Sequence, residues 1–218
     1  MRKADGNGLN RSQALRRVAK QGGDEVLLPA GFVRGRGMNW VRRGTELSHV
    51  INLSAPRGTY FAQWGVLAAG SAPIVWGRSD HQDDVGDALM SGTPSSIRHP
   101  PACSGFRLND VNDPEEIERT ATAMAIDLQV VEERLREFRT RRDLLTYLMA
   151  NRERTDRRDF VIPANLPLKL IHAATPAVLD GAPEAAALVA EAAGEMSSGE
   201  LSQARVKRLQ VALTTGES

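Results

Sequence analysis

The chain of 218 residues is poor in cysteine and in aromatic residues, with one cysteine, Cys103, and 5% Phe, Trp and Tyr. A lone cysteine cannot form an intrachain disulfide, so packing must hold the fold together, as suits a reducing cytoplasm. No run approaches the roughly 18 apolar residues of a membrane span, and the N-terminus shows no apolar signal-peptide core. We therefore expect a cytoplasmic protein of bacterial type with no membrane partner.

An excess of charge of one sign is also absent, because 28 Lys and Arg residues balance 27 Asp and Glu residues. Domains dedicated to binding nucleic acid usually carry a clear basic excess. The balance therefore argues against a dedicated polyanion binder. With 41% hydrophobic residues, a chain of this length can bury a substantial core.

Strand patterns fill the region between Leu28 and Gly70. Apolar residues alternate there with a period of two, and Gly and Pro punctuate them, which predicts antiparallel hairpins. Over residues 47–54 the odd-numbered positions, which include His49, share one face of a strand. Residues 60–67 carry large apolar groups on both faces, which predicts a central strand covered on both sides.

The segments around these strands are less regular. We expect a turn at residues 42–45, a short strand at 74–76 and a strand at 105–108 that returns to the sheet. Between them, residues 77–103 hold Gly, Pro and Ser beside an acidic run. A loop this long is usually either functional or mobile.

Two helices are predicted to cover the sheet. The first starts at Ser12 as its N-cap and ends before Pro29, with Gly22 and Gly23 weakening its middle. The second starts at residues 113–116, where a capping carboxylate precedes a proline and two glutamates. Its apolar stripe repeats at steps of four and three, which predicts a long helix lying on the sheet. The stripe comprises Ile117, Ala121, Met124, Leu128, Val131, Leu135 and Phe138.

These patterns predict an α+β fold, in which an antiparallel sheet of three to five strands packs with an N-terminal helix and a long helix. A helical C-terminal extension follows. We expect a disordered tail over residues 1–11, the α+β domain over 12–155 and the extension over 156–218. Within the extension, prolines are expected to divide the chain into short helices: Pro163, Pro167, Pro176 and Pro183.

Short motifs in the α+β region resemble a known family. They are Gly31-Phe32 at a helix exit, Asn39-Trp40-Val41-Arg42, Val50-Ile51-Asn52-Leu53-Ser54 and Trp64-Gly65-Val66. Over roughly residues 12–150 the chain is similar to the bacterial domain-of-unknown-function family 4304. Ser54 departs from that family's pattern, which has glutamine at this place. The resemblance implies a compact α+β fold, and it supplies no catalytic residue because the family has no assigned activity.

An acidic run offers candidate metal ligands, namely Asp80, His81, Asp83 and Asp84, with Asp87 close behind. Carboxylates and an imidazole are suitable ligands for a divalent metal or for acid-base chemistry. The spacing matches no calcium-binding loop, however. A solvated acidic loop is the competing interpretation. His49 could act as a base, although a histidine between Leu47 and Ile51 is more often a packing residue.

Arginines gather near the first hairpin around one aromatic ring: Arg34, Arg36, Arg42 and Arg43 surround Trp40. Guanidinium groups beside an indole could bind phosphates and stack a base, which indicates a candidate nucleic-acid site. Protection of a sheet edge against aggregation would explain the same residues. A later run, over residues 132–143, mixes arginines with acids including Glu132, and predicts a solvated helix face laced with salt bridges.

No catalytic residue and no cofactor is therefore assigned from the sequence. We expect a non-enzymatic protein-interaction module with another protein as its partner, such as an accessory or immunity-type component of a larger bacterial system. Nucleic-acid binding through the hairpin arginines is the first alternative. The second is a metal-dependent hydrolase that uses the Asp80–Asp87 loop.

Overall fold

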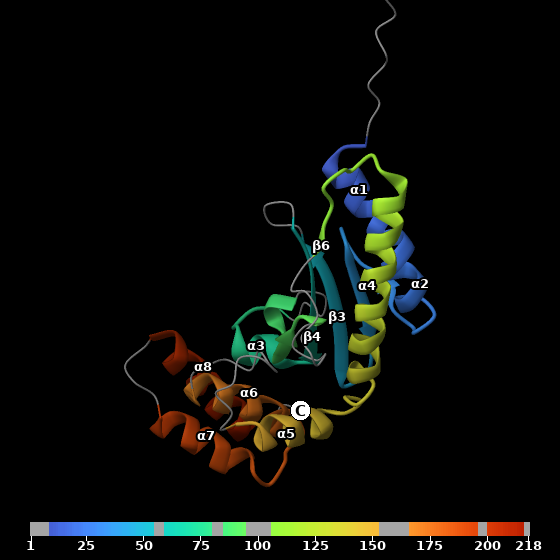
Figure 1. The fold of residues 1–218 in the computed structure, drawn as a ribbon. Coiled ribbons are helices and arrows are strands. Elements are labelled where there is room, and N and C mark those ends of the chain that lie inside the picture. Colours follow the sequence, from blue (N-terminus) through green and yellow to red (C-terminus); the bar gives the residue numbers. More distant parts are fainter. Residues whose placement is uncertain are drawn as a thin grey trace, which may run out of the picture.

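The computed structural model describes residues 9–54, 59–79, 85–94, 106–152, 166–195 and 200–215. An antiparallel sheet lies at its centre, with helices along one side and a further group of helices beyond one end (Figure 1). This arrangement confirms the predicted α+β class with a helical C-terminal part.

The sheet has the strand order β1-β2-β3-β4-β5, and all neighbouring strands are antiparallel. Their bounds are β1 (Val33–Arg34), β2 (Asn39–Arg43), β3 (Leu47–Ser54), β4 (Thr59–Ala68) and β5 (Met90–Gly92). The short β6 (Phe106–Arg107) pairs with the start of β4. β3 spans the residues that the alternation predicts. The predicted turn at residues 42–45 is wrong at its start, because Arg42 and Arg43 continue β2.

Both faces of the sheet are covered, as the pattern of residues 60–67 predicts. On one face Trp40, Ile51 and Trp64 are cross-strand neighbours and are buried in the main core. The other face carries a smaller core beside the 3₁₀ turn η3 (Val85–Asp87). Its buried members are Val41, Val50, Leu67 and Ala88.

The N-terminal helical segment runs through α1 (Arg11–Val18), the π-helical turn η1 (Ala19–Gly23) and α2 (Asp24–Leu27). Asn10 caps this segment, so the predicted cap at Ser12 is wrong. Asn10 Oδ1 accepts from the N–H of Gln13 at 2.9 Å, and Gln13 Oε1 accepts from the N–H of Asn10 at 2.8 Å. The reciprocal pair satisfies two N–H groups that the helix start would otherwise leave unbonded.

The long helix α4 (Pro114–Leu135) begins where the sequence predicts. The carboxylate of Asp113 accepts from the N–H of Glu115 at 2.9 Å, which caps the first turn. Every residue of the predicted apolar stripe is buried. The stripe packs on strands β4 and β6, and also on α1, η1 and α2, so the N-terminal segment lies beside α4 on the same side of the sheet (Figure 1).

The C-terminal helices gather beyond one end of the sheet (Figure 1). They are α5 (Arg141–Ala150), α6 (Leu166–Leu179), α7 (Ala185–Gly194) and α8 (Glu200–Thr215). α6 contacts α5, α7, α8 and the short α3 (Ser71–Val75). Their buried residues belong to the same continuous core as the sheet and α4. None of the helices in the described ranges has the length and apolarity that crossing a membrane requires.

Three local predictions are corrected here. The predicted strand at residues 74–76 is wrong, because the chain forms α3 after a left-handed turn at Gly70, where φ is 83°. Residues 90–92, predicted to be irregular, form β5. The predicted break at Pro176 is also wrong, since α6 continues through it.

Gly22 and Gly23 lie where η1 makes its closest contacts. A Cβ atom at Gly22 would lie 2.3 Å from the carbonyl oxygen of Ala121 in α4, and one at Gly23 would lie 2.4 Å from the ring of Trp40 in β2. Both distances are far below van der Waals contact. The two glycines thus permit the helical segment to approach α4 and the sheet.

We expect Gly22→Ala to lower the free energy of unfolding by about 2 kcal/mol, because the added methyl group overpacks this contact. Urea unfolding followed by tryptophan fluorescence measures the change. Gly194→Ala is the matched control, since a Cβ atom there, at the end of α7, meets nothing within 4 Å. We expect that control to change stability by less than about 1 kcal/mol. Equal effects of the two substitutions would contradict the packing role of Gly22.

Candidate anion-binding site

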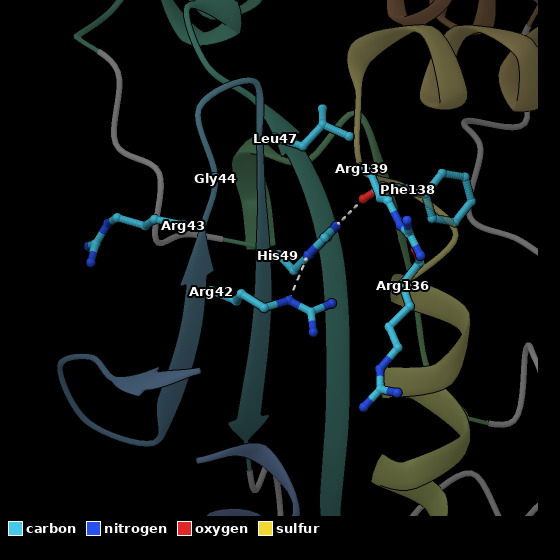
Figure 2. A pocket seen from close by; sticks show the side chains of 8 residues that line it. All are labelled: Arg42, Arg43, Gly44, Leu47, His49, Arg136, Phe138 and Arg139. Carbon is cyan, nitrogen blue, oxygen red and sulfur yellow. Dashed lines mark hydrogen bonds between the residues drawn. The ribbon is translucent and has the colours of Figure 1, made fainter. Parts of the chain in front are cut away.

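A pocket of about 320 Å³ opens between the β2–β3 hairpin and the link that joins α4 to α5. Figure 2 shows the residues that line it, four of which are arginines. They are Arg42, Arg43, Gly44, Leu47, His49, Arg136, Phe138 and Arg139. The walls therefore come from two parts of the chain that are far apart in sequence.

The strand register places Arg42 beside His49. The two residues are cross-strand partners in β2 and β3. Arg42 Nε donates to His49 Nδ1 at 3.2 Å, and His49 Nε2 lies 2.9 Å from the carbonyl oxygen of Phe138 (Figure 2). Because Nδ1 accepts, the ring proton is on Nε2 and donates to Phe138. The imidazole of His49 thus connects the β2–β3 hairpin to the segment that follows α4.

Its surroundings keep His49 neutral. Burial, followed by the positive charge of Arg42, lowers the pKa of His49 to about 4, although the bond to Phe138 and the charge of Glu132 oppose the shift. Both ring nitrogens are engaged in hydrogen bonds. In this arrangement neither nitrogen is available to take a proton from a substrate, which favours the packing interpretation of this histidine over its use as a base.

The carboxylate of Glu132 forms ion pairs with two of the arginines that line the pocket. Its Oε1 accepts from Arg42 Nη1 at 2.7 Å and from Arg136 Nε at 2.7 Å. Glu132 is 4% exposed, so its predicted place on a solvated helix face is wrong. Burial opposes its ionisation, but hydrogen bonds from Arg136 and Arg42 outweigh burial and hold the pKa of the carboxyl below its usual range. The carboxylate is therefore charged at neutral pH.

Further contacts fix the orientation of Arg42. Its Nη1 also donates to the carbonyl oxygen of Ala30 at 3.2 Å, and its guanidinium lies 4.7 Å from the ring centroid of Phe32. Together with His49 and Glu132, these partners come from three separate segments of the chain. The guanidinium of Arg42 is thus held in one place without any ligand.

The other arginines have unused N–H donors in their side chains. Arg139 uses its Nε on the carbonyl oxygen of Arg136 at 3.3 Å, and within the described ranges no residue accepts a hydrogen bond from the side chain of Arg43. Figure 2 shows Arg43 pointing away from His49, at the edge of the pocket. The nearby carboxylates are Glu132, Glu133, whose charge acts on Arg136, and Asp143, whose charge interacts with Arg139. The four arginines outnumber them, which leaves a local excess of positive charge. Such a site attracts an anion.

Acidic groups next to the pocket are engaged elsewhere. Asp143 Oδ2 accepts from the N–H groups of Arg139 and Thr140, each at 2.9 Å, at the start of α5. Glu46 Oε2 accepts from the N–H of Arg141 at 2.9 Å. Both carboxylates stabilise the positive end of α5. Asp143 also interacts electrostatically with Arg139.

The residues predicted to bind nucleic acid lie in two clusters. Arg42 and Arg43 line the pocket. Trp40 is 1% exposed, and its Nε1 donates to Asp24 Oδ1 at 2.9 Å, the same oxygen that accepts from Arg34 Nε at 2.7 Å. A base could not stack on a ring so buried. Arg36 is exposed in the turn between β1 and β2.

The predicted metal ligands Asp80, His81, Asp83 and Asp84 lie outside the described residues, as does Cys103. The neighbouring Asp87 is buried and forms an ion pair with Arg78. Within the described ranges, no three His, Cys, Asp or Glu side chains are grouped closely enough to hold a metal ion.

Three residues of the site were missed by the sequence reasoning: Glu132, Arg136 and Arg139. One signal for Glu132 was present. It follows Leu128 by four residues and Val131 by one, so it borders the buried stripe of α4. The arginines carried no such signal, because the link after α4 meets the hairpin only in the folded chain.

The fold is that of an α+β protein, and arginines line its pocket. Comparisons with protein-family models, with curated proteins and with solved structures found no match. The resemblance to family 4304 therefore stays a prediction.

We expect Glu132→Gln to lower the free energy of unfolding by about 3 kcal/mol, because Arg42 would keep its partly buried charge without the carboxylate. Chemical unfolding at pH 7 measures this loss. Glu118→Gln, an exposed substitution in the same helix, is the control and should stay within about 0.5 kcal/mol. A loss no larger than that of the control would mean that Glu132 does not hold the arginines.

Two histidines that are buried within the described ranges, His49 and His172, should make the protein acid-sensitive. The pKa of His172 is also lowered to about 4, chiefly by burial. An unfolded histidine titrates near about 6.5, so between pH 6.5 and 4 the unfolded state binds more protons. Stability is then present above pH 6.5 and is lost as the pH falls, by up to about 1.4 kcal/mol per pH unit for each histidine.

Urea unfolding at intervals from pH 7.5 to 4.5 measures this dependence. His49→Asn should reduce the slope, because one of the two lowered groups is gone. A slope that stays the same would show that His49 does not contribute.

Proposed function

We propose that this protein is a non-enzymatic interaction module whose arginine pocket receives an anionic group of a partner protein. The observation that carries the proposal is the fixed guanidinium of Arg42, held by His49, Glu132, Ala30 and Phe32 beside arginines with unused donors. A preorganised donor loses little conformational freedom on binding, which favours affinity.

Binding is favoured over catalysis because His49 has both nitrogens engaged. A protein partner is favoured over nucleic acid because Trp40 is buried and the whole chain carries a net charge of only +1. Metal-dependent hydrolysis at the Asp80–Asp87 loop stays a prediction, as do the bacterial origin and the cytoplasmic location.

We expect the wild-type protein to bind a fluorescent oligoglutamate peptide, and the double variant Arg43→Glu/Arg139→Glu to bind it at least tenfold more weakly. The substitutions reverse two charges at the pocket and leave the network of Arg42 in place. Fluorescence anisotropy at about 0.1 M salt measures the affinity.

The control for this experiment is Arg17→Glu/Arg119→Glu, which changes the net charge equally at exposed positions of α1 and α4. It should bind the peptide within about twofold of wild type, since surface charges farther away than about 10 Å are screened. Equal losses in both double variants would mean that the attraction is not local to the pocket. Binding of single-stranded DNA in preference to the peptide would favour the nucleic-acid alternative.

A further inference from the structure

The pocket offers more guanidinium donors than a single carboxylate can use. One guanidinium forms a bidentate pair with a carboxylate and neutralises it. Here Arg42, Arg136 and Arg139 line one pocket together with Arg43 at its edge, and Glu132 is the carboxylate that accepts from two of them. Glu133 beside Arg136 and Asp143 beside Arg139 reduce the excess, and the four arginines still outnumber these three carboxylates.

Geometry also favours a ligand with several acceptor oxygens. Arg42 enters from β2, whereas Arg136 and Arg139 enter from the link after α4. Their guanidinium groups thus approach the pocket from different sides. A tetrahedral group with three terminal oxygens can accept from donors in several directions, whereas a planar carboxylate offers two oxygens in one plane.

From this charge and this arrangement we propose that the pocket binds a phosphate monoester in its dianionic form, carried by a phosphorylated side chain of the partner. The inference rests on the proposed function and names its ligand. Arg42 supplies a fixed donor, and Arg136 and Arg139 close on the phosphate from the opposite wall. Leu47 and Phe138 form the apolar part of the lining, beside which the stem of the phosphorylated residue lies.

The charge of the ligand changes between pH 7.5 and pH 5. A phosphate monoester loses its second proton near pH 6, so about ten times less dianion is present at pH 5 than at pH 7.5. The groups that face the pocket are the four arginines, His49 and Glu132. Glu133 acts on Arg136 and Asp143 on Arg139, and Asp143 and Glu46 are also bonded to N–H groups at the start of α5. The arginines stay protonated throughout, and His49 stays neutral down to a pKa of about 4.

Peptide pools test the proposal. Each pool is degenerate except for one fixed central residue, which is phosphoserine, phosphotyrosine, glutamate or unmodified serine. Binding is measured by fluorescence anisotropy at pH 7.5 and pH 5, with inorganic phosphate and single-stranded DNA as separate probes. We expect one phosphorylated pool to bind at least tenfold more tightly than the glutamate pool at pH 7.5. We expect this advantage to fall about tenfold at pH 5.

Variants locate the binding site. Arg139→Gln should weaken binding of the phosphorylated pool about fivefold or more, and Arg119→Gln, on the same side of the sheet but in the first half of α4, should leave it unchanged. The glutamate pool, measured at both pH values, corrects for any effect of acid on the protein itself.

The remaining outcomes overturn the proposal in distinguishable ways. Equal binding of the phosphorylated and glutamate pools, lost in Arg139→Gln, would overturn the phosphate inference and leave the proposed function standing. Inorganic phosphate binding as tightly as the phosphorylated pool would assign the site to a free anion. Preference for single-stranded DNA, or no binding of any peptide pool, would overturn both the inference and the proposed function.

Discussion

The antiparallel pairing of β2 with β3 is the constraint on which the pocket depends. It makes Arg42 the direct neighbour of His49, so that Arg42 Nε meets an imidazole nitrogen on its own face of the sheet. A shift of one residue in that register would move Arg42 to the opposite face, because side chains alternate along a strand. The register is itself secured by the core, since Trp40, two residues before Arg42, is a buried neighbour of Ile51.

The buried carboxylate of Glu132 shows why such a site is stable without a ligand. An isolated charge inside a protein is very unfavourable, and here each charge of the network has a partner. Glu132 accepts from two arginines, and Arg42 also contacts a carbonyl group and an aromatic ring. The network does not leave the arginines neutralised, because one carboxylate serves two of them. Stability and attraction for anions thus arise from the same arrangement.

The sequence predicted the elements whose apolar residues recur in a regular pattern. The alternation over residues 47–54 located β3 to the residue, and the stripe from Ile117 to Phe138 identified the buried face of α4. The short elements were not predicted, because the five residues of α3 and the three of β5 are too few to establish a period. The break predicted at Pro176 was wrong. A proline inside a helix is unfavourable by itself, but α6 is buried along this stretch and its tertiary packing maintains the helix through Pro176.

The site was harder to predict for a different reason. Arg42 and His49 lie near each other in sequence, and both were recognised as candidates, but as members of separate sites. Their link to Glu132 spans 90 residues for Arg42, and it forms only because α4 lies along the sheet and ends beside the hairpin. Pattern reasoning assigns a charged residue to a face of its own helix. It does not identify which distant strand that face will meet.

The two walls of the pocket differ in how firmly they are held. Arg42 on the sheet contacts three other segments of the chain. Arg136 and Arg139 lie in the short link after α4 and are exposed. The link is anchored at both ends, by the bond from His49 to Phe138 and by Thr140, whose side chain caps α5. The arginine side chains can therefore change rotamer without moving the backbone. A rigid donor facing adjustable ones suits recognition of one anionic group within partners of varied shape, since orientation is fixed on one side and fit is achieved on the other.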